Sequence, residues 1–371
     1  MLKVCLVGSK RHYPAFNSVS SILRDTLGKN QVIELRIKDW LPGSPSVLKV
    51  LLKVFQDLIL NVRVLSCYKK EAINILFLFQ VYYPMSLIMS KLLNLKSIIF
   101  IGGSDFHWSY VEHTSTMGRV LAYANLPIRK ICHEFADALI TLSENMVEIT
   151  GLKKYDYKTW FALPRLDKEF FKEFRISKNY EHRSVVLGFV GSLYRRKGVL
   201  NFIQAIPLIT KERDDCKFLL VGGGPLLEIV RSQRDELEIR ESLEILGFVD
   251  YGDLKNHYNE MKLSILPAYA EGIPSTIFEA MACGTPVLAT PVGSIADVIK
   301  DGQTGFLLES TDPKYIAYRI TRLLENPKLL KTVSENAYEY IRENLREEKV
   351  LESWRRIFEN LVVPPYQKSE D

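Results

Sequence analysis

The sequence predicts an α/β protein made of two doubly wound domains with parallel sheets. A chain of 371 residues is long enough for about two domains of ordinary size. Short β-rich runs alternate with helical patterns, which indicates parallel sheets covered by helices. The alternation is interrupted around Leu163–Glu181, where charged and aromatic residues follow no clear period, and it then resumes. Ligands of such sheets bind at the carboxyl ends of the strands, so we expect the functional residues in the loops that follow them.

The first domain is expected to span residues 1–165, and residues 166–183 are expected to form a linker. Helical patterns such as Ser18–Leu27 and Tyr83–Leu93 lie between its strands. Runs rich in β-branched and aromatic residues predict strands near Lys3–Val7, Val32–Arg36, Ile73–Phe79, Ser97–Ile101 and Ala138–Leu142.

The second domain is expected to span residues 184–350. Polar amphipathic helices follow its strands from Pro313 to about Val362, and we expect residues 351–371 to form a last helix and tail that pack back on the first domain. The predicted strands lie near Val185–Val190, Phe218–Val221, Glu244–Phe248, Leu263–Pro267, Val287–Thr290 and Gly305–Leu308.

Cysteine and histidine usage argues against a metal site. The five cysteines are scattered and form no C-x-x-C pair, and the six histidines form no cluster with them, so we expect buried thiols in a reducing compartment. Neither a secretory signal nor a run of about 18–20 apolar residues is found. The expected location is therefore the cytoplasm.

Positive charge is concentrated in the first 100 residues, which hold 14 Lys and Arg against 5 Asp and Glu, while the whole chain carries +5. No nucleic-acid-binding motif accompanies this charge, so we expect no nucleic acid partner and favour an anionic membrane surface. One segment allows two interpretations: an amphipathic helix on a bilayer, or, as we favour, a core helix with a solvated lysine face. It combines Lys49, Lys53 and Arg63 with apolar residues at helical spacing, namely Val47, Leu48, Leu51, Leu52, Val54, Phe55, Leu58 and Ile59.

A basic glycine loop follows the first strand of the second domain. The strand ends at Val190, Gly191 permits close approach of a ligand, and Lys197 stands where a helix should begin. A lysine in that position can act as a point charge for a phosphate, with Arg195 and Arg196 beside it. The alternative is a solvated basic turn.

Two segments with weaker signals for ligand binding follow the next strands. Gly222-Gly223-Gly224-Pro225 makes a tight strand-to-helix turn, and Phe248 and Val249 at a strand end could border a planar base. Taken singly, the glycine segment could be a plain turn, and Phe248 and Val249 could belong to a core strand. The chain contains neither G-x-G-x-x-G nor a P-loop, which disfavours a dinucleotide oxidoreductase.

The most informative segment runs from Glu271 to Glu279. A turn, Gly272-Ile273-Pro274, follows the first carboxylate, and a short helix is expected to begin near the second. The N–H groups and dipole of this helix suit an anion such as a diphosphate. Glu279 could then accept hydrogen bonds from sugar hydroxyls. The alternative is a capping box of Thr276 and Glu279, with Glu271 solvated. A glycosidase pair is disfavoured, because eight helical residues span about 12 Å.

Together, these segments after the strands resemble those of the retaining GT-B glycosyltransferases of glycosyltransferase family 4. Glu271 to Glu279 resembles the E-x(7)-E motif of that family, and Ala280-Met-Ala-Cys-Gly-Thr-Pro-Val287 matches its continuation. Gly191–Gly198 resembles the phosphate loop. Ala136–Met146 resembles the last strand and helix start of the first domain. The similarity covers nearly the whole chain and is strongest from Val185 to Leu308.

The resemblance implies a role for each of these residues. Lys197 and Arg196 would hold the diphosphate of a UDP- or GDP-sugar, Glu279 the ribose, and Glu271 the transferred sugar. Asp105 would serve the acceptor side in the first domain. No metal and no cofactor besides this co-substrate are implied. The nucleotide would also be bordered by Gly191, Ser192, Gly223, Phe248, Val249, Gly272, Ile273, Pro274 and Ser275.

Two positions depart from the family pattern. Ser192 stands where the family often has arginine, which leaves that role to Arg195 or Arg196. Gly102 stands where many members have the histidine of H-G-x-D, so the role of this histidine has no obvious holder.

We expect a retaining transferase that moves a hexose-type sugar to a glycan or lipid-linked acceptor. Its setting would be the inner face of a membrane, in the synthesis of a surface polysaccharide or glycolipid. Two alternatives remain: another GT-B enzyme such as a nucleotide-sugar epimerase, and a non-catalytic protein that binds nucleotide sugars.

Overall fold

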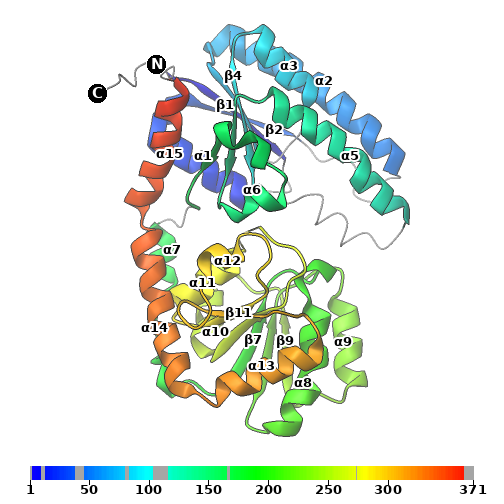
Figure 1. Cartoon of the computed structure of the whole chain (residues 1–371), viewed down its shortest axis with the longest axis vertical. Coiled ribbons are helices and arrows are strands. Elements are labelled where there is room, and N and C mark those ends of the chain that lie inside the picture. The colour runs from blue at the N-terminus through cyan, green and yellow to red at the C-terminus, as the bar shows by residue number, and fades with distance from the viewer. Residues whose placement is uncertain are drawn as a thin grey trace. The chain divides into compact units, whose positions relative to one another are not determined.

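The chain folds into two compact units, each built on a six-stranded parallel sheet covered by helices (Figure 1). The computed structural model describes residues 2–9, 13–37, 46–79, 83–102, 116–164, 168–272 and 274–362. Among the described residues, unit 1 comprises 2–9, 13–37, 46–79, 83–102, 116–164 and 347–362, and unit 2 comprises 168–272 and 274–346. The two doubly wound α/β sheets are those that the sequence predicts.

The sheet of unit 1 has the strand order β2-β1-β3-β4-β5-β6, so its order reverses between β1 and β3. Its last strand, of three residues, was not predicted, because so short a run shows no periodicity. The strands are β1 Val4–Ser9, β2 Val32–Ile37, β3 Ile75–Phe79, β4 Lys96–Ile101, β5 Ala138–Thr141 and β6 Thr159–Phe161.

Two helix layers cover the sheet of unit 1. One layer consists of α2 (Ser46–Glu71), α3 (Pro84–Leu92) and α5 (Thr116–Phe135), which pack on one sheet face through residues such as Leu60, Leu87 and Cys132. The other consists of α1 (Tyr13–Leu27) and α15 (Glu347–Val362), which contact the opposite face. The short helix α6 (Asn145–Ile149) follows β5.

The last helix, α15, is a core element of unit 1. The Trp354 ring lies with its centroid 6.3 Å from that of Phe77 and 6.0 Å from that of Phe100, and its Nε1 donates to the carbonyl oxygen of Leu163 at 3.1 Å. Burial of this large side chain explains why the chain returns to unit 1 after the helices of unit 2.

The sheet of unit 2 has the order β12-β11-β10-β7-β8-β9. Read from β9, this is the doubly wound order 3-2-1-4-5-6, which reverses between β7 and β10. The strands are β7 Val186–Val190, β8 Lys217–Val221, β9 Leu243–Gly247, β10 Leu263–Leu266, β11 Val287–Ala289 and β12 Phe306–Leu307. The helices are α7 Lys168–Glu173, α8 Val199–Glu212, α9 Leu227–Glu236, α10 Leu254–Glu260, α11 Ser275–Ala282, α12 Ile295–Val298, α13 Pro313–Leu324 and α14 Pro327–Asn344.

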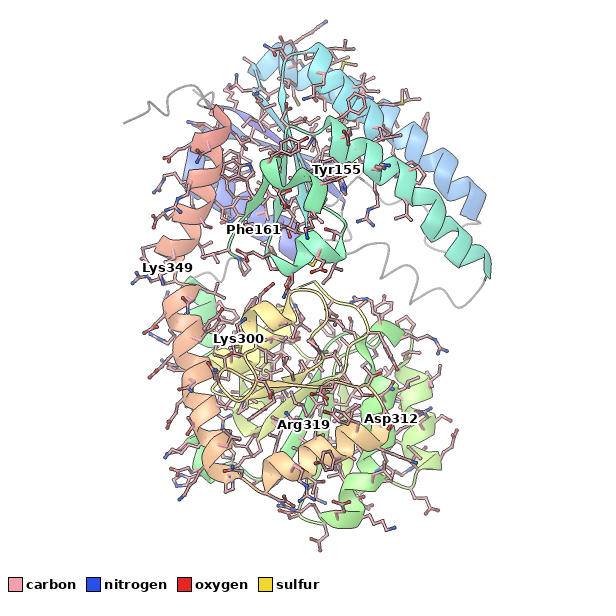
Figure 2. All side chains as sticks on the ribbon, in the orientation of Figure 1. Tyr155, Phe161, Lys300, Asp312, Arg319 and Lys349 are labelled. Carbon is pink, nitrogen blue, oxygen red and sulfur yellow. The ribbon has the colours of Figure 1, made fainter. Side chains whose placement is uncertain are left out.

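Local capping explains where α13 begins. Asp312 stands before Pro313, and its side chain accepts hydrogen bonds from the backbone N–H groups of Lys314 at 2.8 Å and Tyr315 at 3.3 Å (Figure 2). Proline at the first helical position and an acidic residue just before it form a start signal that is legible in sequence.

The segment expected as a linker, residues 166–183, instead belongs to unit 2. Its last residue, Arg183, is buried and donates to the carbonyl oxygens of Cys283 at 2.7 Å and Met261 at 3.1 Å. Lone carbonyl groups at helix ends need donors, and a guanidinium supplies several. Arg183 therefore ties the segment to the ends of α10 and α11, which its irregular sequence pattern did not reveal.

Helix α2 also differs from its expected character. It packs in the core through Leu60 and Val64, as a core helix should, but three residues of its predicted apolar spacing, Phe55, Leu58 and Ile59, are exposed. The side chains of Lys49 and Lys53 lie outside the described part of the chain.

Candidate functional site

The predicted site residues of unit 2 lie on one edge of its sheet. Every strand pair is parallel, so the loops after β9, β8, β7 and β10 leave the same edge, and these strands are successive neighbours. The loops that start with Gly191 and Pro267 flank the point where the strand order reverses. Ligands of open α/β sheets bind at such a point.

Two glycines let these loops pack backbone against backbone. A Cβ atom on Gly198, which has φ +70°, would lie 1.9 Å from the carbonyl oxygen of Pro267. One on Gly222, with φ +135°, would lie 1.9 Å from the carbonyl oxygen of Gly191. The N–H of Tyr269 donates to the Arg196 carbonyl oxygen at 2.7 Å. The loops after β8, β7 and β10 therefore form one connected rim.

Three charged groups meet on this rim. Glu271 Oε1 forms ion pairs with the Nζ of Lys197 and with Nη1 of Arg196, the latter at 2.9 Å. The Lys197 and Glu271 side chains are only 9% and 5% exposed. Two cations thus share the Glu271 carboxylate at this edge, and the charge of Lys197 also acts on the carboxylate of Glu279. Arg195 is exposed, so Arg196 is the arginine that the structure brings to this cluster.

Glu279 occupies the second turn of α11 and is 2% exposed. Its carboxylate accepts a hydrogen bond from the hydroxyl of the buried Tyr258 at 2.9 Å. Burial raises the pKa of Glu279, while hydrogen bonds from Tyr258 and Ser275 and the charge of Lys197 act in the opposite direction.

The capping-box alternative for Glu279 is not what the structure contains. Pro274 is the N-cap residue of α11, and no side chain caps the helix start. Because the helix begins at Ser275, Thr276 lies inside it and Glu279 is too far along to reach the N-cap N–H. The first N–H groups of α11 stay available at the end of the helix, directly after the Glu271 loop.

An exposed aromatic ring marks the other end of the rim. Phe248 follows β9 and is 85% exposed, and Val249 beside it is half-buried. A Cβ atom on Gly223 would lie 3.9 Å from the Cβ of Phe248, so the triglycine turn and the ring are adjacent. An exposed ring here could stack on a planar group.

The remaining predicted residues lie on the rim, apart from two that fall outside the described part of the chain. Among them, Gly191, Ser192, Gly272, Pro274 and Ser275 lie in the rim loops or at the start of α11. Asp105 and Ile273 lie outside the described residues, as do the segments 10–12, 80–82 and 103–115 that follow β1, β3 and β4.

Two contact residues were absent from the sequence prediction. Tyr258 lies on α10, and its bond to Glu279 joins residues 21 apart, a pairing that no local pattern announces. Tyr269 donates its hydroxyl hydrogen to Asn201 Oδ1 at 3.1 Å, and its N–H holds the Arg196 loop. Its place two residues before Glu271 was the only sequence signal available.

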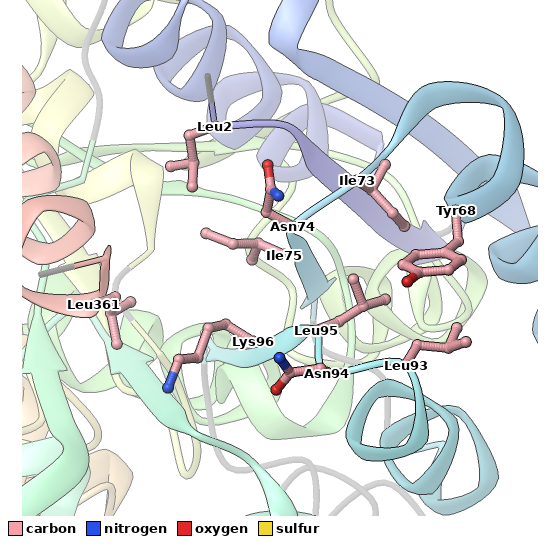
Figure 3. Close-up of a pocket in the computed structure, with 10 residues that line it drawn as sticks. All are labelled: Leu2, Tyr68, Ile73, Asn74, Ile75, Leu93, Asn94, Leu95, Lys96 and Leu361. Carbon is pink, nitrogen blue, oxygen red and sulfur yellow. The ribbon is translucent and has the colours of Figure 1, made fainter. Parts of the chain in front are cut away.

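A pocket of about 480 Å³ lies elsewhere, at the amino ends of β1, β3 and β4 in unit 1 (Figure 3). Leu2, Ile75 and Lys96, at or next to the first residues of these strands, line it together with Tyr68 and Leu361. This is the strand end opposite to the one that binds ligands in such sheets, so we do not assign the site there.

The described residues show neither a metal site nor a membrane span. They contain no group of three or more His, Cys, Asp and Glu side chains able to hold a metal ion. None of the helices described is long and apolar enough to cross a membrane. All five cysteines are unpaired thiols, and four of them are buried.

Comparison with known proteins places a sequence similarity on unit 2. Residues 170–340 match the family model described as glycosyl transferases group 1. N-acetyl-alpha-D-glucosaminyl L-malate synthase from Bacillus anthracis is 31% identical over 52% of this chain and 48% of its own length. The capsular polysaccharide biosynthesis glycosyltransferase CapM from Staphylococcus aureus is 27% identical over 56% and 58%. The chain thus spans about half the length of the curated relatives it matches.

Solved structures match over almost the entire chain. Sucrose-phosphate synthase from Thermosynechococcus elongatus aligns with a TM-score of 0.76 at 17% identity, over 97% of this chain and 99% of that one. Anabaena HepE, crystallised with UDP and glucose, aligns with a TM-score of 0.73 at 15% identity, over 97% and 100%. The whole chain therefore has the two-domain GT-B fold, and residues 170–340 carry the sequence similarity to glycosyl transferases group 1.

Proposed function

We propose that this protein is a retaining glycosyltransferase of family 4 that moves a hexose-type sugar from a UDP- or GDP-sugar to a glycan or lipid-linked acceptor. One observation carries the proposal: Lys197 and Arg196 are held at the strand-order reversal of the unit 2 sheet and share a single carboxylate. Two cationic side chains held together at this edge suit the two negatively charged phosphates of a nucleotide diphosphate. The match of residues 170–340 to glycosyl transferases group 1 supports the assignment.

The donor would lie along the rim from Phe248 to Glu271. The base would stack near Phe248, which is exposed at the end of β9. The diphosphate would meet Lys197, Arg196 and the first N–H groups of α11, where helix N–H groups favour an anion. Glu279 would accept hydrogen bonds from the ribose hydroxyls, as acidic residues do in other doubly wound sheets.

Glu271 would change partners when the donor binds. In the structure it forms ion pairs with both Lys197 and Arg196. The diphosphate would take over these cations, because it carries more negative charge than one carboxylate. Glu271 would then be free to accept hydrogen bonds from hydroxyls of the transferred sugar.

The reaction breaks the bond between the anomeric carbon and the terminal phosphate oxygen. Negative charge develops on that oxygen, where Lys197 and Arg196 would stabilise it, and such preorganised charge is often the largest catalytic contribution. The acceptor hydroxyl oxygen forms the new bond to the anomeric carbon on the same face, and its proton passes to the departing diphosphate. In this proposal the two side chains supply the positive charge, and no metal ion is required.

The acceptor and the biological setting are part of the same proposal. We assign the acceptor to unit 1, at the carboxyl ends of β1, β3 and β4, with Asp105 among its contacts. The name of the Staphylococcus aureus relative, a capsular polysaccharide biosynthesis glycosyltransferase, supports a role in cell-surface polysaccharide or glycolipid synthesis.

A thermal-shift panel of UDP-, GDP- and ADP-sugars tests donor binding. A ligand that binds only the folded state raises the melting temperature, by the equivalent of about 2.7 kcal/mol at a hundredfold excess over its Kd. We expect one base to give a clear rise. No rise with any of the three, in a protein shown to be folded, would contradict the proposal.

Lys197→Ala tests the catalytic step. We expect it to abolish sugar transfer from the donor identified by the panel and to leave the circular dichroism spectrum unchanged. The matched control is Lys217→Ala, since Lys217 is exposed at the start of β8. Wild-type turnover in Lys197→Ala would refute the assigned role, and donor binding without turnover in the wild type would favour a non-catalytic binding protein.

A further inference from the structure

Helix α2 buries polar residues and exposes apolar ones. Asp57 and Asn61 are 2% and 7% exposed and lie on its inner face with Leu60 and Val64. The outward face carries an exposed stripe at the helical spacing i, i+3, i+4 and i+7, formed by Phe55, Leu58, Ile59 and Val62. An amphipathic helix on the surface of a protein in water has the opposite pattern.

The neighbouring helix α3 repeats this arrangement. Ser86 and Ser90 are fully buried on its inner face, whereas Met85, Ile88 and Leu92 are exposed. These three residues follow the spacing i, i+3 and i+7, so they form a stripe on one side of the helix.

Helix α5 shows the same pattern in its described part. Arg129 and His133 are buried, while Ile131 and Phe135, which lie one turn apart, are exposed. Helix α3 contacts both α2 and α5, so the three helices form one layer (Figure 1). We call the outward side of this layer the α2–α3–α5 face.

The polar residues under this face hold the helices in this orientation. The Asp57 carboxylate accepts hydrogen bonds from the N–H groups of Met85 at 2.9 Å and Ser86 at 3.0 Å. Helix α2 thus supplies the cap for the amino end of α3, whose own N-cap residue, Tyr83, provides none. Rotating α2 to bury its apolar stripe would break these bonds.

The opposite helix layer provides an internal comparison. Among the described side chains of α1 and α15, no large hydrophobic residue is exposed. The same sheet is therefore covered on one side by helices with an ordinary pattern and on the other by helices with the reversed one. A contiguous exposed apolar patch indicates an interaction surface.

Charge identifies the partner. The sequences of α2, α3 and α5 contain nine Lys and Arg against three Asp and Glu, and one residue of each sign, Arg129 and Asp57, is buried. Arg63, Lys69, Lys70, Lys91 and Lys130 are exposed. A face that combines apolar residues with basic ones suits an anionic lipid surface, in which apolar side chains enter the headgroup boundary and basic ones meet lipid phosphates.

We propose that the α2–α3–α5 face docks unit 1 on an anionic lipid bilayer, with the helices lying in the interface. A second copy of the chain fits this face less well, because a twofold pairing would bring two basic surfaces together. The proposal does not rest on sugar transfer, and its test measures lipid binding alone.

Cosedimentation of the full chain with lipid vesicles tests the proposal. We expect binding to vesicles with about one third phosphatidylglycerol in phosphatidylcholine, and weak binding to phosphatidylcholine alone. Binding should fall steeply as salt rises from about 0.05 to about 0.5 M, because salt screens the attraction between exposed charges.

Two variants locate the contact. Val62→Glu and Leu92→Glu place a carboxylate at the most exposed apolar positions of α2 and α3, which are 68% and 78% exposed, so neither should disturb the core. We expect each to weaken binding about tenfold or more. The matched control, Ile229→Glu on α9 of unit 2, replaces an apolar residue that is also exposed and should bind as the wild type does. Urea unfolding verifies that all three variants fold.

Three outcomes would overturn the proposal. The first is no binding to anionic vesicles at low salt, and the second is wild-type binding by both Val62→Glu and Leu92→Glu. The third is a dimer, seen by analytical ultracentrifugation without lipid, that Val62→Glu dissociates, since the face would then join two copies of the chain.

Discussion

The rim of unit 2 and the α2–α3–α5 layer of unit 1 both bury charged side chains, but they do so differently. On the rim, Lys197, Arg196 and Glu271 neutralise one another at a sheet edge where a ligand can replace one partner. In the layer, Asp57 is fixed by backbone N–H groups of α3. Burying an ion costs several kcal/mol unless it is paired. Partners that a ligand can exchange indicate a binding site, whereas backbone partners indicate a structural role.

Glu271→Gln is the substitution expected to have the largest effect. It leaves Lys197 and Arg196 without their carboxylate, which should destabilise the ligand-free protein by about 2–3 kcal/mol in urea unfolding. Sugar transfer should fall at least about 100-fold, because the contact to the transferred sugar is lost. Added UDP or GDP should restore most of the lost stability, since its phosphates neutralise the same cations.

The control for this variant is Glu244→Gln, because Glu244 is exposed on β9. We expect it to behave as the wild type in unfolding and in transfer. If Glu271→Gln were as stable as the wild type without ligand, the ion pairs would not hold the rim, and the contrast with Asp57 would fail.

His133 provides a test on the side of unit 1. It lies on α5, and burial, together with the charges of Arg129, Lys158 and Lys154, lowers its pKa to about 3. The unfolded chain takes up a proton near pH 6.5, so the stability that neutral His133 contributes is present above that pH and is lost as the pH falls toward 3. Between pH 6.5 and pH 5 this loss should amount to about 2 kcal/mol.

His133→Gln should remove about this part of the pH dependence. Tryptophan fluorescence in urea is a suitable probe, because Trp160 and Trp354 pack in the core of unit 1. His182→Gln, at an exposed histidine of unit 2, is the matched control for the substitution itself. Equal slopes for His133→Gln and the wild type would show that His133 is not kept neutral by the fold.

Much of the fold was predictable because its signals are local. Apolar runs identified β1, β3 and β4, and Asp312 with Pro313 identified the start of α13. The glycine-containing segments after the strands predicted that the candidate residues would share a sheet edge, because the carboxyl ends of parallel strands lie at the same edge. Their roles in ligand binding remain part of the proposal.

The features that were missed depend on contacts between distant residues. Arg183 ties residues 166–183 to unit 2 through carbonyl groups about 100 residues away. The reversed pattern of α2 could not be read from periodicity, because its polar Asp57 and apolar Ile59 are placed by the packing of α3 and the sheet. Hydrophobic spacing gives the faces of a helix but does not say which face is inside when both are partly apolar.

Tyr258→Phe is expected to have the smallest effect. It tests whether the hydrogen bond from Tyr258 lowers the pKa of Glu279 so that its carboxylate can bind a ligand. The substitution removes the hydroxyl that donates to Glu279 and keeps the ring, so the loss of stability should be about 1–2 kcal/mol. This hydrogen bond opposes the effect of burial, so its loss should raise the pKa of Glu279 further. Ribose binding requires the ionised carboxylate, so nucleotide affinity should begin to fall at a higher pH than in the wild type.

Calorimetric Kd values between about pH 5 and pH 8 would reveal this shift, with Tyr318→Phe on the exposed side of α13 as control. Coincident pH profiles would mean that Tyr258 is structural like Asp57, and the rim would then be tuned through Lys197, Arg196 and Glu271 alone.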